Sequence, residues 1–222
     1  MTATVASELL RPRLLEGVSV LLAGADSEPG ARESRGAAVR EACAGLGARV
    51  SVLPPVHDPA VGAEEGEAAI DEAVEGALAE LGGVELLVVD GAGLFAAALR
   101  AAGGQGGPEG ARAALRTCLD VSWNVTRAVV NRAFLERGGG GRIVYLAPAS
   151  DAGEHAEAAR AGLENLARTL SIEWARHGIT VVTIASMVAT PAGDVAALTA
   201  YLASPAGAYF SGCLLDLRGV AA

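Results

Sequence analysis

Lysine is absent from this chain of 222 residues, because all 17 residues in its Lys and Arg count are arginine. A guanidinium keeps its positive charge and does not titrate in the range that a proton-transferring amine needs. Chemistry that depends on a lysine side chain is therefore excluded. Aromatic residues are also scarce, at 4% against 51% hydrophobic residues, so the core must consist mostly of Ala, Val and Leu. Such a composition suits tightly packed α/β layers.

Positive charge is in short supply overall, with a net charge of -9. Nucleic-acid surfaces need clustered positive charge, so we expect no nucleic-acid partner. The acidic residues are scattered and predict a solvated surface. No apolar run reaches the roughly 20 residues of a membrane span, and no signal peptide is evident at the N-terminus. We therefore expect a cytoplasmic protein without a membrane partner.

Cysteine and histidine are few, and their spacing does not match that of a metal site. The cysteines are Cys43, Cys118 and Cys213, and the histidines are His57, His155 and His177. The cysteines lie in apolar contexts, which predicts buried free thiols. We expect neither a zinc site nor a disulfide framework.

Apolar, β-branched runs alternate with longer helical patterns, which indicates a parallel sheet with crossover helices. Strands are expected at 18–23, 49–53, 85–93 (with a terminal glycine turn), 142–147, 179–185 and 213–217. Helices are expected at 36–46, 64–81, 111–136, 155–176 and 195–203. The prediction is one α/β domain over residues 1–222, a doubly wound parallel sheet of about seven strands of Rossmann type. The seventh strand would lie in a divergent part of the chain.

Four stretches of sequence are similar to those of one known family. They are GRIVYLAPAS at 141–150, ARAGLENLARTLSIEWARHGITVVTIA at 159–185, YLASPAGAYFSGCLLDLRG at 201–219 and ELLVVDGAG at 85–93. In order and spacing they resemble the short-chain dehydrogenase/reductase family over nearly the whole chain. The resemblance implies a Rossmann fold and the scaffold of an NAD(P)-dependent oxidoreductase.

The positions that carry the chemistry of that family hold other residues here. By the resemblance, the catalytic serine, tyrosine and lysine correspond to Pro148, Ala156 and Arg160, the relay asparagine to Asp120, and a Pro-Gly pair to Ser186 and Met187. Pro148 has no side-chain donor, and Ala156 cannot act as a general acid. We therefore predict that no residue of this chain is catalytic, and that it is a pseudoenzyme.

Four polar residues lie close in the sequence to these positions. His155 adjoins the vacant tyrosine position, but neighbouring residues on a helix point about 100° apart. Tyr145 lies on a strand and is expected to pack against a helix. Ser150 and Asp151 follow that strand. A divergent NAD(P)-dependent oxidoreductase with a non-standard site stays open as an alternative.

The candidate cofactor-binding residues are Gly24, Gly30, Gly36 and Asp90. The loop 24–36 is longer than the glycine loop of the family, and it contains Asp26, Glu28 and Glu33, whose carboxylates would repel a pyrophosphate. Residues 53–55, Leu-Pro-Pro, offer no acidic group for an adenosine ribose. We expect degenerate NAD(P) binding and no cofactor. The alternative, in which Arg32 or Arg35 reaches a phosphate, stays open.

The segments that form subunit contacts in the family resemble their counterparts in this chain. In the family, the helices corresponding to 111–136 and 155–176 and the closing segment 201–219 contact partner subunits. The helix 111–136 carries one apolar stripe of Val125, Val129 and Ala133 and another of Leu119, Trp123, Val130 and Phe134. One stripe must face the sheet, so the other predicts a partner, unless it contacts loops of the same chain.

We thus expect a catalytically inactive, structural or regulatory subunit. Its partner would be an active paralogue, an NAD(P)-dependent ketoreductase or dehydrogenase, in a hetero-oligomer, or a copy of itself. The remaining alternative is a small-molecule binding module that uses the cleft near Asp90, Asp120 and Pro148.

Overall fold

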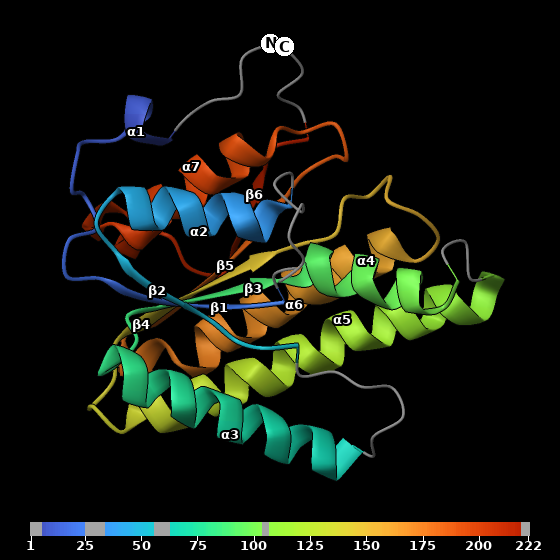
Figure 1. Cartoon of the computed structure of the whole chain (residues 1–222), viewed down its shortest axis with the longest axis horizontal. Helices are drawn as coiled ribbons and strands as arrows, with labels where there is room; N and C mark the ends of the chain where they lie inside the picture. Colours follow the sequence, from blue (N-terminus) through green and yellow to red (C-terminus); the bar gives the residue numbers. More distant parts are fainter. Residues whose placement is uncertain (1–5, 25–33, 56–62, 104–106, 219–222) are drawn as a thin grey trace.

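The fold is a parallel sheet of six strands between two layers of helices (Figure 1). It is seen in a computed structural model that describes residues 6–24, 34–55, 63–103 and 107–218. The strand order is β2-β1-β3-β4-β5-β6. The strands are β1 Ser19–Ala23, β2 Arg49–Val52, β3 Leu86–Asp90, β4 Gly141–Leu146, β5 Ile179–Ala185 and β6 Cys213–Asp216. All six expected strands are confirmed, and the described ranges contain no seventh.

The central strands are buried on both faces, as parallel strands covered by helices must be. Every residue of β1 and β3 is buried. Successive side chains of a strand point to opposite faces, so Leu21 joins one hydrophobic core and Leu22 joins the other. These continuous apolar runs are the reason that the sequence predicted the sheet.

Each core lies beneath its own layer of helices. One layer consists of α1 Ala6–Leu9, α2 Arg35–Gly45 and α7 Ala192–Ala203. The other consists of α3 Ala63–Leu81, α4 Gly91–Ala101, α5 Gly107–Val129 and α6 Ala156–Glu173. The doubly wound Rossmann arrangement is therefore confirmed. No helix in the described ranges is long and apolar enough to cross a membrane.

The glycine turn expected after β3 is instead the first turn of a helix, α4. The Asp90 side chain caps this helix by accepting a hydrogen bond from the amide of Gly93. A Cβ on Gly93 would lie 2.4 Å from the carbonyl oxygen of Gly24, so glycine permits this turn to approach the end of β1. The predicted strand 85–93 thus ends at Asp90.

The expected helix 111–136 begins earlier, as α5, and its last part is π-helical, at Val130–Leu135. A π-turn adds one residue per turn and rotates the side chains that follow it. Val130 and Phe134 are both 0% exposed, so these two members of the second apolar stripe belong to the core. Of that stripe, Trp123 is exposed and Leu119 is half-buried.

Candidate functional site

The candidate site lies at the carboxyl ends of β1 and β3, where the strand order reverses. From β1 the chain moves outward to β2, and from β3 it moves in the opposite direction to β4, β5 and β6. Open α/β sheets bind ligands at such a switch point, beside the N-termini of the helices that follow the strands. Gly24, Gly36 and Asp90, three of the four candidate cofactor-binding residues, come together here. Gly30 and the rest of 25–33 lie outside the described residues.

The Asp90 carboxylate is the central polar group of this edge. It is 1% exposed, and its Oδ2 accepts the amide of Gly36 at 2.9 Å. Its Oδ1 accepts the amide of Gly93, also at 2.9 Å. Both amides belong to first turns of helices, α2 and α4, whose N-terminal N–H groups attract anions. A carboxylate of the chain itself therefore satisfies donors at both helix ends.

Arg35 crosses from the start of α2 to the connection between β5 and α7. Its Nη2 donates a hydrogen bond to the carbonyl oxygen of Met187 at 2.7 Å. Burial lowers the pKa of Arg35, and the nearby carboxylates of Asp90 and Asp151 oppose that shift. The guanidinium is thus held against the protein by a carbonyl and by two negative charges.

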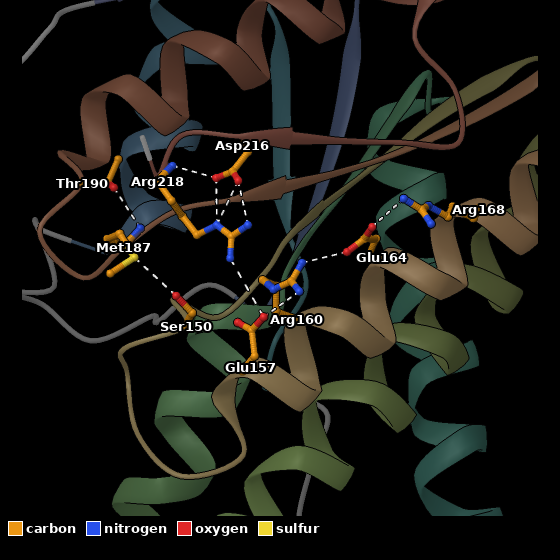
Figure 2. A network of polar contacts seen from close by, with 9 residues as sticks. All are labelled: Ser150, Glu157, Arg160, Glu164, Arg168, Met187, Thr190, Asp216 and Arg218. Carbon is orange, nitrogen blue, oxygen red and sulfur yellow. Dashed lines mark hydrogen bonds and ion pairs between the residues drawn. The ribbon is translucent and has the colours of Figure 1, made fainter. Parts of the chain in front are cut away.

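The β5–α7 connection, residues 186–191, is held by side chains from both sides. The amide of Met187 donates to Thr190 Oγ1 at 2.9 Å, and that of Val188 donates to Asp151 Oδ1 at 2.9 Å. Ser150 Oγ donates to the Met187 sulfur at 3.3 Å (Figure 2). With the contact from Arg35, this connection is tied to α2 and to the β4–α6 loop.

The positions assigned to the catalytic serine and tyrosine are apolar and buried. Pro148 is buried after β4, and Ala156, the first residue of α6, is 0% exposed. Neither has a side chain that can donate or accept a proton. Asp120, the position of the relay asparagine, is exposed on α5.

Of the polar residues near these positions, Tyr145 and His155 lie beside other side chains. Tyr145 is fully buried and its Oη lies 2.9 Å from Thr126 Oγ1 of α5, which confirms that it packs against a helix. Burial raises the pKa of Tyr145 well above its usual range. His155 precedes α6 with a positive φ of 64°, and its Nε2 lies 3.6 Å from Glu154 Oε1.

Arg160, at the lysine position, lies between two carboxylates of its own helix (Figure 2). Its Nη2 donates to Glu157 Oε1 and its Nη1 to Glu164 Oε2, both at 2.7 Å. The residue is only 9% exposed, and its Nε is buried with no hydrogen-bond partner among the described residues. Arg160 therefore acts as the centre of an ion-pair cluster on α6.

The same cluster reaches the segment after β6, as Figure 2 shows. Arg218 lies 4.0 Å from Glu157 and bonds Asp216 at 2.7 Å. The hydrogen bond from Arg218 lowers the pKa of Asp216 to about 2. The hydrogen bond from Arg160 likewise lowers the pKa of Glu157. Alternating charges thus join α6 to the closing strand.

Sequence reasoning identified Asp90 but missed the contact of Arg35 with Met187. These two residues are separated by 152 positions, and no local pattern marks one as the partner of the other. The described residues contain no group of three or more His, Cys, Asp or Glu side chains arranged to hold a metal ion. Cys43 and Cys118 are buried free thiols, as predicted, whereas Cys213 is half-buried.

The chain is similar in sequence and in structure to known proteins. Residues 63–194 match the family model described as Enoyl-(Acyl carrier protein) reductase. A hydroxysteroid dehydrogenase from Escherichia coli is similar in structure, with a TM-score of 0.70 and 17% identity, covering 94% of this chain and 99% of that one. A short-chain dehydrogenase from Mycobacterium smegmatis gives a TM-score of 0.67 and 23% identity, with 95% of each chain covered.

A short-chain dehydrogenase/reductase from Serratia marcescens gives a TM-score of 0.66 and 21% identity, covering 92% of this chain and 97% of that one. No curated protein sequence matches the chain. The solved structures share the fold, and the family model covers more than half of the sequence. The chain belongs to the short-chain dehydrogenase/reductase family.

Proposed function

We propose that this chain is a catalytically inactive member of its family, a structural or regulatory subunit that assembles with an active relative. That relative would be an NAD(P)-dependent ketoreductase or dehydrogenase. The observation that carries the proposal is the Asp90 carboxylate, which accepts amides of both α2 and α4 at 2.9 Å. The N-terminus of α2, the helix after the first strand, is where the pyrophosphate of a dinucleotide would need free amides.

The residues at the sheet edge do not fit a nicotinamide dinucleotide. A pyrophosphate at the N-terminus of α2 would meet the buried negative charge of Asp90. Arg35, the first residue of α2, already donates to Met187. Pro54 and Pro55, which follow β2, carry no group that could bind an adenosine ribose. We therefore derive no catalytic step that uses such a cofactor.

The side chains that would transfer a proton are missing as well. Ala156 and Pro148 cannot supply a proton or polarise a carbonyl, and Arg160 is engaged with Glu157 and Glu164. Residues 186–191 form a short connection that is held by hydrogen bonds. Active sites of this kind need a segment that closes over the substrate and excludes water. The short connection leaves little chain for that purpose.

Two surfaces support assembly with a partner. Trp123 on α5 is 40% exposed and Ile172 on α6 is 76% exposed, although both are large and apolar. At the other side, β6 is an edge strand of the sheet, and Tyr209 just before it is 90% exposed. Both surfaces belong to the segments expected to contact other subunits.

Cofactor titration tests the proposal most directly. Purified protein is titrated with NADH and NADPH to millimolar concentration while nucleotide fluorescence and calorimetric heat are recorded, with an active short-chain dehydrogenase as the positive control. We expect no saturable binding and no turnover of carbonyl substrates. Saturable binding together with hydride transfer would overturn the proposed inactivity.

Co-purification tests the second half of the proposal. The chain is expressed together with dehydrogenases encoded beside it, and a tag on this chain alone is used for capture. We expect one active enzyme to elute in a fixed ratio. If every such enzyme elutes without this chain, the subunit role is wrong.

A groove beside α1 and α7 favours a second candidate function, the binding of a small apolar molecule. Its volume is about 440 Å³, and it is lined by Leu9, Leu10, Thr190, Asp194, Ala197, Leu198, Tyr201 and Leu217. This volume lies in the range of small-molecule sites. A thermal-shift screen of apolar metabolites tests this candidate, and ligand-dependent stabilisation lost in a Leu198→Arg variant would support it.

A further inference from the structure

The groove beside α1 and α7, which we call the α7 groove, has a single charged group in its wall. Of the described residues that line it, Asp194 alone is charged. Thr190 and Tyr201 contribute hydroxyl groups, and the remaining lining residues are leucines and an alanine. A molecule bound in the α7 groove therefore meets one negative charge on an otherwise apolar wall.

Asp194 belongs to the face of α7 that forms this wall. Asp194, Ala197, Leu198 and Tyr201 follow one another at intervals of three and four residues, which places them on one face of the helix. Asp194 is half-buried there. Its carboxylate is thus part of the groove and is partly withdrawn from solvent.

The Asp194 carboxylate has no ion-pair or hydrogen-bond partner in the part of the chain that the structure describes. Only the backbone of this residue is engaged, since its amide donates to the carbonyl oxygen of Pro191. A negative charge in the first turn of a helix favours the helix dipole. That structural role leaves the acceptor sites of both carboxylate oxygens unused.

The α7 groove is polar at one end of this face and apolar toward the other. Thr190 lies at the polar end, where its Oγ1 accepts the amide of Met187 at 2.9 Å and retains its own O–H as a donor. Tyr201 comes seven residues after Asp194, about 10 Å farther along the helix axis. Its ring packs edge-on against Phe210, with the ring centroids 6.1 Å apart. Leu198 lies between the two ends.

We propose that the α7 groove binds a small amphipathic amine, with its ammonium group at Asp194 and its alkyl chain along Leu198 toward the ring of Tyr201. Charge complementarity identifies this occupant. The ammonium donates hydrogen bonds to the unused carboxylate oxygens, and the chain is removed from water by the leucines. The volume of about 440 Å³ accommodates such a molecule.

Other small occupants fit the same wall less well. A neutral apolar molecule would displace water from Asp194 without replacing the lost hydrogen bonds, which costs free energy. An alkyl carboxylate would place a second negative charge beside the first. A small polar cation would pair with Asp194 but would leave the apolar end of the groove in contact with water.

This inference deepens the second candidate function and rests on it, because it names the class of ligand for the same groove. It does not depend on the proposed inactivity, which concerns the Asp90 carboxylate and the positions of the catalytic side chains.

Three probes with the same alkyl chain test the charge preference. Octylamine, which is an ammonium ion near neutral pH, is compared with octanol and octanoate by calorimetric titration of the full chain at low salt. We expect the dissociation constant of octylammonium to be at least about tenfold lower than that of either other probe. Added salt should weaken octylammonium binding and leave octanol binding unchanged.

Substitution of Asp194 then assigns the preference to its carboxylate. Asp194→Asn keeps the shape and removes the charge, so the advantage of octylammonium over octanol should disappear, whereas Asp194→Glu should retain it. Asp194→Arg should reverse the order, so that octanoate binds most tightly. Glu41→Gln, an exposed change on α2 in the same helical layer, is the matched control and should alter none of the three constants. Far-UV circular dichroism checks that each variant is folded.

The possible failures are distinguishable. If octanol binds as tightly as octylammonium and Leu198→Arg abolishes both, the groove takes an apolar molecule and the amine is wrong. If octylammonium shows no saturable binding, the inference is also overturned, and the thermal-shift screen decides the second candidate function separately. If light scattering shows a dimer that Leu198→Arg dissociates, a second copy covers the groove, which equally overturns the inference.

Discussion

The Asp90 carboxylate accepts the backbone amide of Gly36 at 2.9 Å and thereby joins the end of β3 to the first turn of α2. With Gly93 on its other oxygen, one buried side chain anchors two helices at the edge where this fold binds ligands. The contact stabilises the fold at an edge where related folds bind a ligand, and its contribution to the free energy of unfolding can be measured.

Replacing the carboxylate of Asp90 by an amide should destabilise the protein. In an Asp90→Asn variant only one oxygen remains to accept, and the amide NH₂ faces a backbone N–H. We expect a loss of about 1–3 kcal/mol in the free energy of unfolding, measured by urea denaturation. The exposed Glu72→Gln change serves as the control. Equal stability of the two variants would mean that the Asp90 hydrogen bonds contribute little.

The buried hydroxyl pair of Tyr145 and Thr126 should show coupling in a double-mutant cycle. Tyr145→Phe removes one partner of the 2.9 Å contact and leaves the Thr126 hydroxyl unsatisfied, at a cost of about 1–2 kcal/mol. Thr126→Val removes the other partner and leaves the Tyr145 hydroxyl unsatisfied. We expect the double variant to lose less stability than the sum of the singles, and strict additivity would show that the two hydroxyls do not interact.

Restoring a lysine at position 160 should not restore chemistry. Arg160→Lys leaves Ala156 and Pro148 unchanged, so we expect no reductase activity with either nicotinamide nucleotide. A single ammonium is also a poorer match than the guanidinium for Glu157 and Glu164 together, so stability should fall by about 1 kcal/mol. Thermal unfolding measures the second effect, and any measurable reductase activity would contradict the first.

The pair of Asp216 with Arg218 should make stability depend on acid pH. Arg218 lowers the pKa of Asp216 from its ordinary 3.8 to about 2. The unfolded chain therefore binds the proton more readily, and the stabilisation is complete above about pH 4 and is lost as the pH falls toward 2. Urea unfolding between pH 5 and pH 2 should show a smaller decrease in an Asp216→Asn variant. Parallel curves for wild type and variant would argue against this pair.

Cysteine labelling should distinguish one thiol from the other two. Burial raises the pKa of Cys43 and Cys118 to about 12, so they hold almost no thiolate at pH 8. Cys213 is half-buried on β6 and should react first with a disulfide reagent. We expect one fast thiol in the native protein and three after denaturation. The fast phase should vanish in Cys213→Ser, and its persistence there would place it on another cysteine.

The sheet could be predicted because its signal is local. Six short apolar runs predicted the strands, and the four inner ones, β1, β3, β4 and β5, are largely buried on both faces. The helix α4 was missed because Gly91 and Gly93 indicate a turn, whereas the Asp90 cap and the close approach of Gly24 make a helix of the same residues. The π-helical segment after α5 likewise depends on packing, which the spacing of apolar residues in the sequence does not reveal.

The residues that stand at the family's catalytic positions could be read from the sequence, whereas the contacts of the candidate site could not. Pro148, Ala156 and Arg160 could be read directly against a family pattern. The Asp90–Gly36 and Arg35–Met187 contacts span 54 and 152 positions, and they arise only when the strand ends are brought together. Arg35 also illustrates why a basic residue near a glycine loop is a weak sign of phosphate binding.

The short bridge from Ala185 to Ala192 limits what could be built on this scaffold. Its backbone is held by hydrogen bonds with Arg35, Asp151 and Thr190. These contacts and its short length prevent it from closing over a substrate. Grafting reactive side chains onto the neighbouring helix would leave them open to bulk water. Under the proposed inactivity, a designer seeking a working reductase would have to lengthen this bridge before installing any proton donor.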